Sequence, residues 1–214
     1  MRFLLLDAVG IVAVSVAALF VFVMSGGYAL QNLAVALVFL IVGIAITKYM
    51  YDEKKEKGVY EHERSWQNVL SNSLFPLISC GAYYATGNSA WIAAYVGAFA
   101  GAMADKFGSE LGVLSPNPMS LGSFKAVRQG VSGAISVLGT YLSFIGALLI
   151  GLAGFYLYDY SALSILSIGL FGLAGSFADS IAGVFEEKGI GTKSTSNFIC
   201  TLVSGALAYF FVVI

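Results

Sequence analysis

The stretch WIAAYVGAFAGAMADKFGSELG, residues 91–112, begins as an apolar run and ends with Asp105, Lys106 and Glu110. A transmembrane helix needs about 17–25 predominantly apolar residues, and the run from 88 to 105 is long enough. A charged side chain at the centre of such a helix costs about 2.5–3.5 kcal/mol on insertion scales, so charges near hydrocarbon usually serve function. The stretch therefore predicts a membrane helix that carries an acidic group to one face of the bilayer.

The rest of the chain has the composition of a membrane protein. Of its 214 residues 58% are hydrophobic and 11% are charged, whereas soluble domains carry about 25% charged residues. Apolar runs of spanning length lie at 3–24, 29–50, 68–86, 88–105, 130–157, 161–185 and 196–214. The first run exceeds the about 7–15 apolar residues of a signal peptide. We therefore expect an all-α, polytopic helix bundle with about seven transmembrane helices.

Basic residues predict the orientation of this bundle. All eleven Lys and Arg fall in segments on one side, and the loops 25–28, 86–89 and 156–160 contain none. The positive-inside rule places the N-terminus in the cytoplasm and the C-terminus outside. We expect an integral membrane protein, in the cell membrane if the source is prokaryotic, with its active site facing the cytoplasm.

We interpret the chain as a single membrane domain, 1–214. It comprises two N-terminal helices (1–50), a charged cytoplasmic segment (51–67) and a five-helix catalytic core (68–214).

A short internal repeat places two acids at matched depth. GAMAD (101–105) and GSFAD (175–179) both end helices that run from outside to inside. At about 1.5 Å per residue, Asp105 and Asp179 lie roughly 25–27 Å from the outer ends, just inside the cytoplasmic edge of the hydrocarbon. The third and fourth helices would then repeat the fifth and sixth in parallel. The alternative is that each aspartate snorkels or pairs with a nearby lysine.

Polar residues on other helices are predicted to lie at the same level. One stripe combines Arg64, Asn68 and Asn72. A second stripe, in the helix that starts with RQGVSGAIS, contains Ser132, Ser136, Thr140 and Ser143. A third contains Asn197 and Thr201. Each stripe could instead serve interhelical hydrogen bonding. Together with the two acids, they favour a polar pocket that opens to the cytoplasm.

The available side chains limit the chemistry of this pocket. His62 is the only histidine, and Cys80 and Cys200 lie in apolar runs, which leaves almost no material for a zinc site or a Ser-His-Asp triad. Carboxylates favour a hard cation such as Mg²⁺, with Asp105, Glu110 and Asp179 as candidate ligands. The net charge of −1 argues against nucleic acid as a partner.

A basic, glycine-rich segment from Lys125 to Gly133 precedes the predicted fifth helix. Exposed N–H groups and the helix dipole favour an anion at such a start, and Gly130 and Gly133 would let a phosphate approach the backbone. Lys125 and Arg128 add positive charge. No GxxxxGK[ST] loop occurs in the sequence, so this would be a nucleotide-phosphate site other than a P-loop.

Several motifs occur in the order found in a known membrane family. They are ERSWQNVLSNSL, ADKFGSELG, KAVRQGVSGAISVLGT, FADSIAGVFEEKG and SNF, which together cover roughly 60–214. In these motifs the chain resembles the phytyl-phosphate kinase family of the tocopherol pathway, which includes transmembrane-protein-19-like proteins. The resemblance implies phosphoryl transfer from a nucleoside triphosphate, CTP in the related polyprenol and phytol kinases, to an isoprenoid monophosphate.

The resemblance also assigns motif positions. The acidic motif matches Asp105, Ser109 and Glu110; the basic-glycine motif matches Lys125, Gly130, Ser132 and Gly133; the third matches Asp179, Ser180 and Gly183. Three positions depart from the family pattern. Thr192 and Lys193 stand where the family often has two Asn residues, and Lys106 stands where Thr or Ser often follows the first Asp.

The leading hypothesis is thus a Mg²⁺-dependent prenyl-phosphate kinase. Asp105, Glu110 and Asp179 would hold the metal; Lys125, Arg128, Ser109, Ser132 and the Gly130–Gly133 turn would hold the triphosphate; Arg64, Asn68, Asn72, Asn197 and Ser180 would orient the substrate. A cytidylyltransferase that forms a CDP-lipid, or a prenol kinase, would use similar ligands. An ion-coupled transporter and a purely structural bundle are the alternatives outside these enzyme classes.

Overall fold

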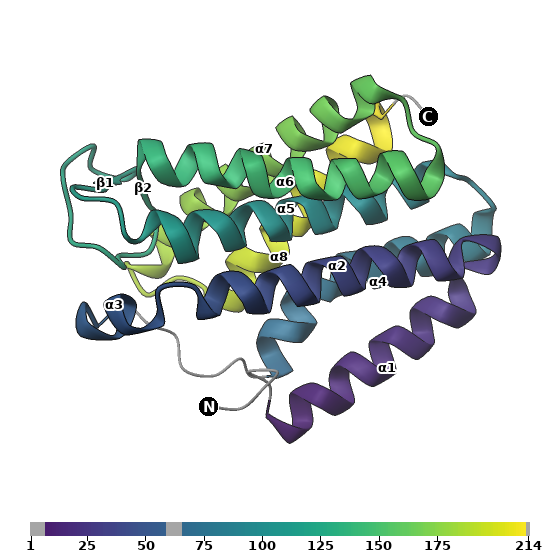
Figure 1. Ribbon diagram of the computed structural model, residues 1–214, viewed down its shortest axis with the longest axis horizontal. Coiled ribbons are helices and arrows are strands. Elements are labelled where there is room, and N and C mark those ends of the chain that lie inside the picture. Colours follow the sequence, from purple (N-terminus) through teal and green to yellow (C-terminus); the bar gives the residue numbers. More distant parts are fainter. Residues whose placement is uncertain (1–6, 59–65, 213–214) are drawn as a thin grey trace.

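The computed structural model describes residues 7–58 and 66–212. Within them, seven long helices run roughly along one axis (Figure 1). They are α1 (Ala8–Met24), α2 (Ala29–Lys48), α4 (Trp66–Thr86), α5 (Ala90–Gly112), α6 (Val137–Tyr158), α7 (Ala162–Glu186) and α8 (Lys193–Phe211). Shorter elements are η1 (Gly26–Tyr28), α3 (Tyr51–Glu56) and the antiparallel pair β1 (Met119–Ser120) and β2 (Ala134–Ile135).

Four of the described helical segments are long and apolar enough to cross a membrane: Gly26–Lys48, Val137–Tyr158, Ala162–Glu186 and Lys193–Phe211. The shorter α1 is also apolar. The expectation of an all-helical, polytopic membrane protein is thereby confirmed in its general form. The crossing of all seven helices and the inward N-terminus stay predictions.

Helix α5 lies at the centre of the bundle and is buried from Ile92 to Ala104. Its alanines and glycines allow neighbouring backbones to approach closely, as is common between membrane helices. Gly172 of α7 shows how tight this packing is, because a Cβ there would lie 2.6 Å from Cβ of Ala147 and 2.8 Å from the carbonyl oxygen of Ala100. Large apolar side chains on α1, α2, α6 and α7 point outward, where lipid would cover them.

Two helix boundaries differ most from the prediction. Helix α5 continues to Gly112 instead of ending at 105, because Lys106 and Glu110 pair one turn apart within it and are both buried. Helix α6 starts at Val137 and not at 130, because Gly130 and Gly133 have positive φ angles of 85° and 72°. The Ser136 hydroxyl then caps α6 by accepting a hydrogen bond from Gly139 N. The expected helix start RQGVSGAIS is therefore a loop that enters β2.

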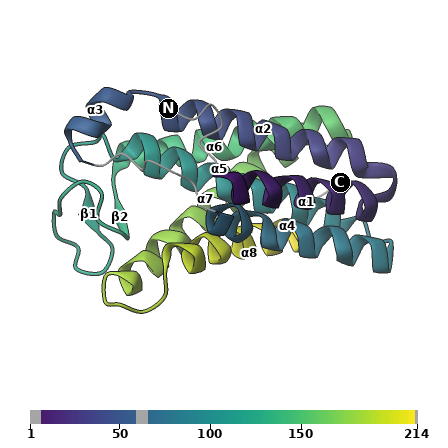
Figure 2. The same ribbon diagram turned by 90° about the horizontal axis from the view of Figure 1, so that it is seen from below.

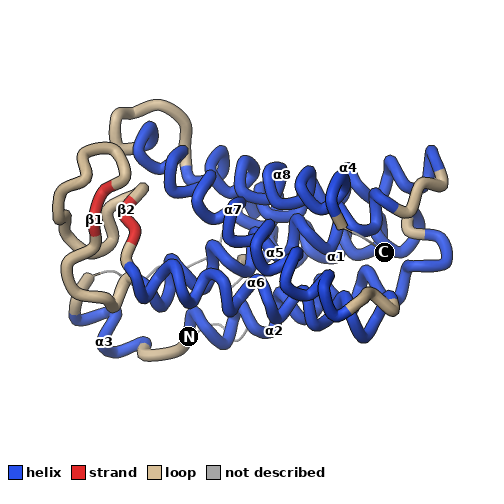
Figure 3. Tube along the Cα trace, turned by 90° about the horizontal axis from the view of Figure 1, so that it is seen from above, coloured by secondary structure: helices blue, strands red, loops and turns tan. Residues whose placement is uncertain are grey.

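The connections gather at the two ends of the bundle. Helix α3, the β1–β2 hairpin and its loops, and the turn 187–192 lie at one end, as Figure 2 and Figure 3 show from two sides. The loops 25–28, 86–89 and 159–161 lie at the opposite end (Figure 1). Near the end that carries the loops 25–28, 86–89 and 159–161, Asn32 of α2 accepts hydrogen bonds from the hydroxyls of Tyr95 and Tyr158. These bonds attach α2 to α5 and α6.

We expect Gly172→Ala to lower the free energy of unfolding by about 1–3 kcal/mol, because its methyl group would force α7 away from the backbone of α5. Gly27→Ala is the matched control, since a Cβ there meets nothing within 4 Å, and it should change stability by less than about 0.5 kcal/mol. Thermal unfolding of both variants in detergent tests this. Equal melting temperatures would contradict the packing described.

Candidate functional site

A cavity of about 320 Å³ lies between α5, α6, α7 and the loop before α6. Each helix contributes residues spaced i, i+3, i+4 and i+7, which form one helix face. These are Asp105, Gly108, Ser109 and Gly112 of α5; Ser136, Gly139, Thr140 and Ser143 beginning at the cap of α6; and Leu173, Ser176, Phe177 and Ser180 of α7. The volume lies in the range of small-molecule sites, about 300–1,000 Å³.

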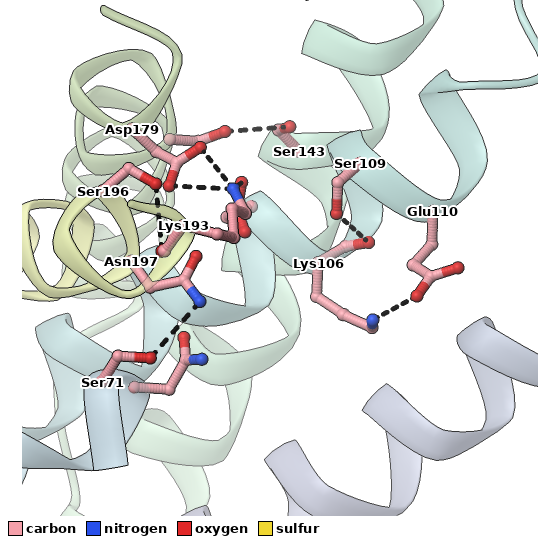
Figure 4. Close-up of polar contacts among 12 residues, drawn as sticks. Ser71, Lys106, Ser109, Glu110, Ser143, Asp179, Lys193, Ser196 and Asn197 are labelled. Carbon is pink, nitrogen blue, oxygen red and sulfur yellow. Dashed lines mark hydrogen bonds and ion pairs between the residues drawn. The ribbon is translucent and has the colours of Figure 1, made fainter. Parts of the chain in front are cut away.

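Two of the predicted acids meet in this cavity through a lysine. The ammonium nitrogen of Lys193 lies 2.9 Å and 3.1 Å from the two carboxylate oxygens of Asp179. It also lies 3.8 Å from Oδ1 of Asp105. Figure 4 shows Lys193 reaching Asp179 from the start of α8. A buried carboxylate requires such a partner, and the lysine that supplies it is distant in sequence from both acids.

Glu110 also borders the cavity, but its carboxylate is not grouped with those of the two aspartates, which corrects the predicted set of three metal ligands. Its carboxylate accepts hydrogen bonds from Thr47 Oγ1 and Lys54 Nζ, both at 3.0 Å, and pairs with Lys106. Five residues separate it from Asp105, so the two side chains point about 140° apart around α5. In the described parts of the chain, no three His, Cys, Asp or Glu side chains are placed to hold one metal ion.

The glycine-rich loop lines the cavity, but not as the predicted helix start. Gly130, Ser132 and Gly133 all border the cavity. The Ser132 N–H donates to Glu187 Oε1 at 3.0 Å, so this donor is already occupied by a carboxylate. Gly133 packs on α7, where a Cβ would lie 2.7 Å from the carbonyl oxygen of Ser180.

The two basic residues of this segment lie outside the cavity, contrary to the prediction that they bind the triphosphate there. Lys125 and Arg128 are both exposed, because the hairpin turns them away from the helices. Arg128 instead borders a more open groove of about 800 Å³, together with Lys57 and Glu187. Gln129 and Gly130 line both the groove and the cavity, so this part of the loop forms the partition between them.

The predicted substrate-orienting asparagines do not border the cavity. Asn197 Nδ2 lies 3.4 Å from both Asn68 Oδ1 and Ser71 Oγ, which links α8 to α4 (Figure 4). Asn72 donates to the carbonyl oxygen of Asn68 at 2.8 Å within α4. Asn68 and Asn197 therefore have the interhelical role that was the alternative interpretation, whereas Asn72 bonds within its own helix. Arg64, the remaining member, lies outside the described residues.

Sequence reasoning missed three polar residues that line the cavity: Lys193, Gln129 and Ser176. Gln129 donates to the carbonyl oxygen of Ser115 at 3.0 Å, and the hydroxyls of Ser176 and Ser143 lie 3.4 Å apart. Lys193 carried a readable signal. It stands where the resembled family often has Asn; the structure adds that it is the first residue of α8, where the positive end of the helix dipole disfavours a cation.

Comparison with known proteins is consistent with this membrane fold. Residues 1–205 match a family described as integral membrane protein DUF92. An uncharacterized membrane protein of Methanocaldococcus jannaschii is 36% identical over 181 residues, which cover 83% of this chain and 74% of that protein. Protein PGR of Arabidopsis thaliana is 29% identical over 179 residues, 70% of this chain and 62% of the relative.

An uncharacterized membrane protein of a Synechocystis strain is 28% identical over 129 residues, which cover 56% of this chain and 50% of the relative. No solved structure matches the chain significantly.

We expect Lys54→Met to lower the free energy of unfolding by about 3–5 kcal/mol, because it would leave buried Glu110 without one of its cations. Lys54 is fully buried and also donates to the carbonyl oxygen of Thr47 at 2.7 Å. Lys57→Met removes a lysine whose partner is the exposed Glu53, and it should cost at most about 1 kcal/mol. Thermal unfolding compares them, and an equal loss in both would refute the anchoring role of Lys54.

Proposed function

The chain belongs to the DUF92 family of integral membrane proteins, and we propose that it is a membrane-embedded kinase for a phosphorylated lipid. The enzyme would transfer a phosphoryl group from a nucleoside triphosphate, CTP in the first instance, to an isoprenoid monophosphate. One observation carries the proposal. At one end of an apolar bundle, a polar cavity combines Asp105, Asp179 and Lys193 with a glycine-rich loop.

The donor set of the cavity fits Mg²⁺. Its lining offers carboxylates and hydroxyls but no His or Cys, and such oxygen ligands suit a hard cation. Mg²⁺ usually keeps several waters and binds through one or two carboxylates plus substrate phosphates, so Asp105 and Asp179 suffice without Glu110. When bound, Mg²⁺ would neutralise the charge that develops on the transferred phosphoryl group.

Cationic and hydroxyl groups of the chain would hold the phosphates. Lys193 supplies an ammonium at the cavity, and Ser109, Thr140 and Ser180 supply hydroxyl donors. An oxygen of the acceptor monophosphate would attack the γ-phosphorus, and the bond from that phosphorus to the β,γ-bridging oxygen would break. CDP leaves and the lipid becomes a diphosphate. The acceptor is already an anion, so no general base is required.

The surface of α6 next to the cavity supports an amphiphilic acceptor. Ser136 and Thr140 face the cavity, whereas Val137 and Tyr141 on the other side of the same turns are 91% and 62% exposed. Leu173 and Phe177 add apolar lining to the cavity itself. A lipid could therefore present its phosphate to the polar lining while its tail remains among apolar side chains.

We expect purified protein with Mg²⁺, γ-labelled CTP and geranylgeranyl or phytyl phosphate to form a labelled prenyl diphosphate. Asp179→Asn should lower the rate at least about 100-fold, because it removes charge from the group that holds the metal. Asp159→Asn is the matched control. Asp159 lies at the far end in a left-handed conformation that Asn also tolerates, so its rate should equal the wild-type rate.

The position of the label separates the remaining alternatives. Transfer of an α-phosphate with release of pyrophosphate would indicate a cytidylyltransferase. Absence of transfer to every prenyl alcohol and phosphate tested, with any of the four nucleotides, would refute the kinase. Ion-coupled solute flux in liposomes without nucleotide would then favour a transporter, although transporter sites usually lie near the bilayer midplane.

A further inference from the structure

We infer that Lys193 is a tethered cation that occupies the position of a divalent metal ion between Asp105 and Asp179 and exchanges with that ion. When a divalent cation enters, the two carboxylates release the ammonium, which stays at the cavity and becomes available to an anion. The identity of that anion as a nucleotide phosphate rests on the proposed function; the exchange itself does not.

The exposed fractions of the Asp105, Asp179 and Lys193 side chains show which of these charged groups can move away from the other two. The side chains of Asp179 and Asp105 are 8% and 16% exposed, whereas that of Lys193 is 43% exposed. The ammonium therefore reaches the carboxylates from the solvent side, and its side chain can withdraw without unfolding α8. The aspartates are fixed by α5 and α7, so they remain in place to receive another cation.

A buried side-chain oxygen near Lys193 on α8 lacks a hydrogen-bond partner, although its residue is not part of the cavity lining. Asn197 is 4% exposed, and its Oδ1 has no hydrogen-bond partner. It lies one helical turn after Lys193, and Figure 4 shows its amide nitrogen directed to Ser71 and its oxygen on the side of Lys193. A hydrated Mg²⁺ keeps bound waters that donate hydrogen bonds, which such an acceptor requires.

The start of α8 explains what the released ammonium would do. The cap residue Thr192 accepts no hydrogen bond through its side chain from a backbone N–H of the first turn, because its hydroxyl pairs with that of Thr195. The start of α8 therefore keeps the positive end of its helix dipole without a side-chain cap. Lys193 lies in that same turn and lines the cavity. Once the aspartates hold a metal ion, the ammonium and the helix terminus would attract the same anion, and metal entry would thereby increase the affinity for phosphate.

Divalent-cation binding to the full-length protein, without nucleotide, tests the exchange. We expect Lys193→Gln to bind Mn²⁺ at least about tenfold more tightly than wild type in electron paramagnetic resonance titrations, because it removes a competing charge within 4 Å of both carboxylates. Lys193→Arg keeps the competitor and should not tighten binding. Lys188→Gln removes the same charge from the adjoining turn, where Lys188 stacks on Phe185, and should stay within about twofold of wild type.

A second measurement uses the unaltered protein, so it does not depend on the folding of a variant. Acylation of Lys193, followed by mass spectrometry, should become several-fold faster when Mg²⁺ is added, because the ammonium loses its ion pairs. The rate at Lys188 should not change. Unchanged or weaker Mn²⁺ binding by folded Lys193→Gln, or an unchanged acylation rate at Lys193, would overturn the exchange.

These results can be separated from the test of the kinase. Cation exchange without phosphoryl transfer would refute the proposed kinase and leave the exchange intact. Phosphoryl transfer without cation exchange would refute only the role assigned to Lys193.

Discussion

One ammonium group, that of Lys193, joins three helices at the end of the bundle where the hairpin lies. It contacts carboxylates from α5 and α7 while belonging to the first residue of α8. Two largely buried carboxylates from different helices repel each other unless a cation lies between them, and breaking such a buried group by removing one member is costly. The contact therefore balances the two carboxylates of α5 and α7 and sets the charge of the cavity that these helices border. The cation that lies between the Asp105 and Asp179 carboxylates therefore decides which chemistry the cavity can support.

A second buried ion group, on another face of α5, has a different role. Glu110 joins Lys54 of α3 and Thr47 of α2 to the central helix, so the N-terminal helices are attached to the core by charge as well as by apolar packing. The helical period separates the two groups. Asp105 and Ser109, four residues apart, border the cavity, whereas the carboxylate of Glu110, although it also borders the cavity, bonds to Thr47 of α2 and Lys54 of α3. One short stretch of sequence thus supplies a candidate site and an anchor on opposite sides of a single helix.

Hydropathy was sufficient to locate the long helices, because apolar runs of spanning length rarely occur outside membrane helices. The repeated Gly-x-x-Ala-Asp pattern also led to Asp105 and Asp179, which the structure brings to one lysine. The errors have identifiable causes. Grouping Glu110 with Asp105 ignored the 3.6-residue period, which could have been applied to the sequence directly. The start of α6 was placed too early because the positive φ angles of Gly130 and Gly133 depend on the packing of the loop. Lys193 was missed because its contacts join residues that are distant in sequence.

The contact between Gly133 and α7 limits how the cavity can change shape. A Cβ at Gly133 would lie 2.6 Å from the backbone nitrogen of Val184, and one at Gly183 would lie 3.0 Å from Cα of Gly133, so the two backbones touch without intervening side chains. Close-packed backbones of this kind move as one body. The glycine-rich loop and α7 should therefore form a rigid part of the cavity lining. A change in the shape of the cavity would then come from other lining groups, such as the long, partly exposed side chain of Lys193 at the start of α8.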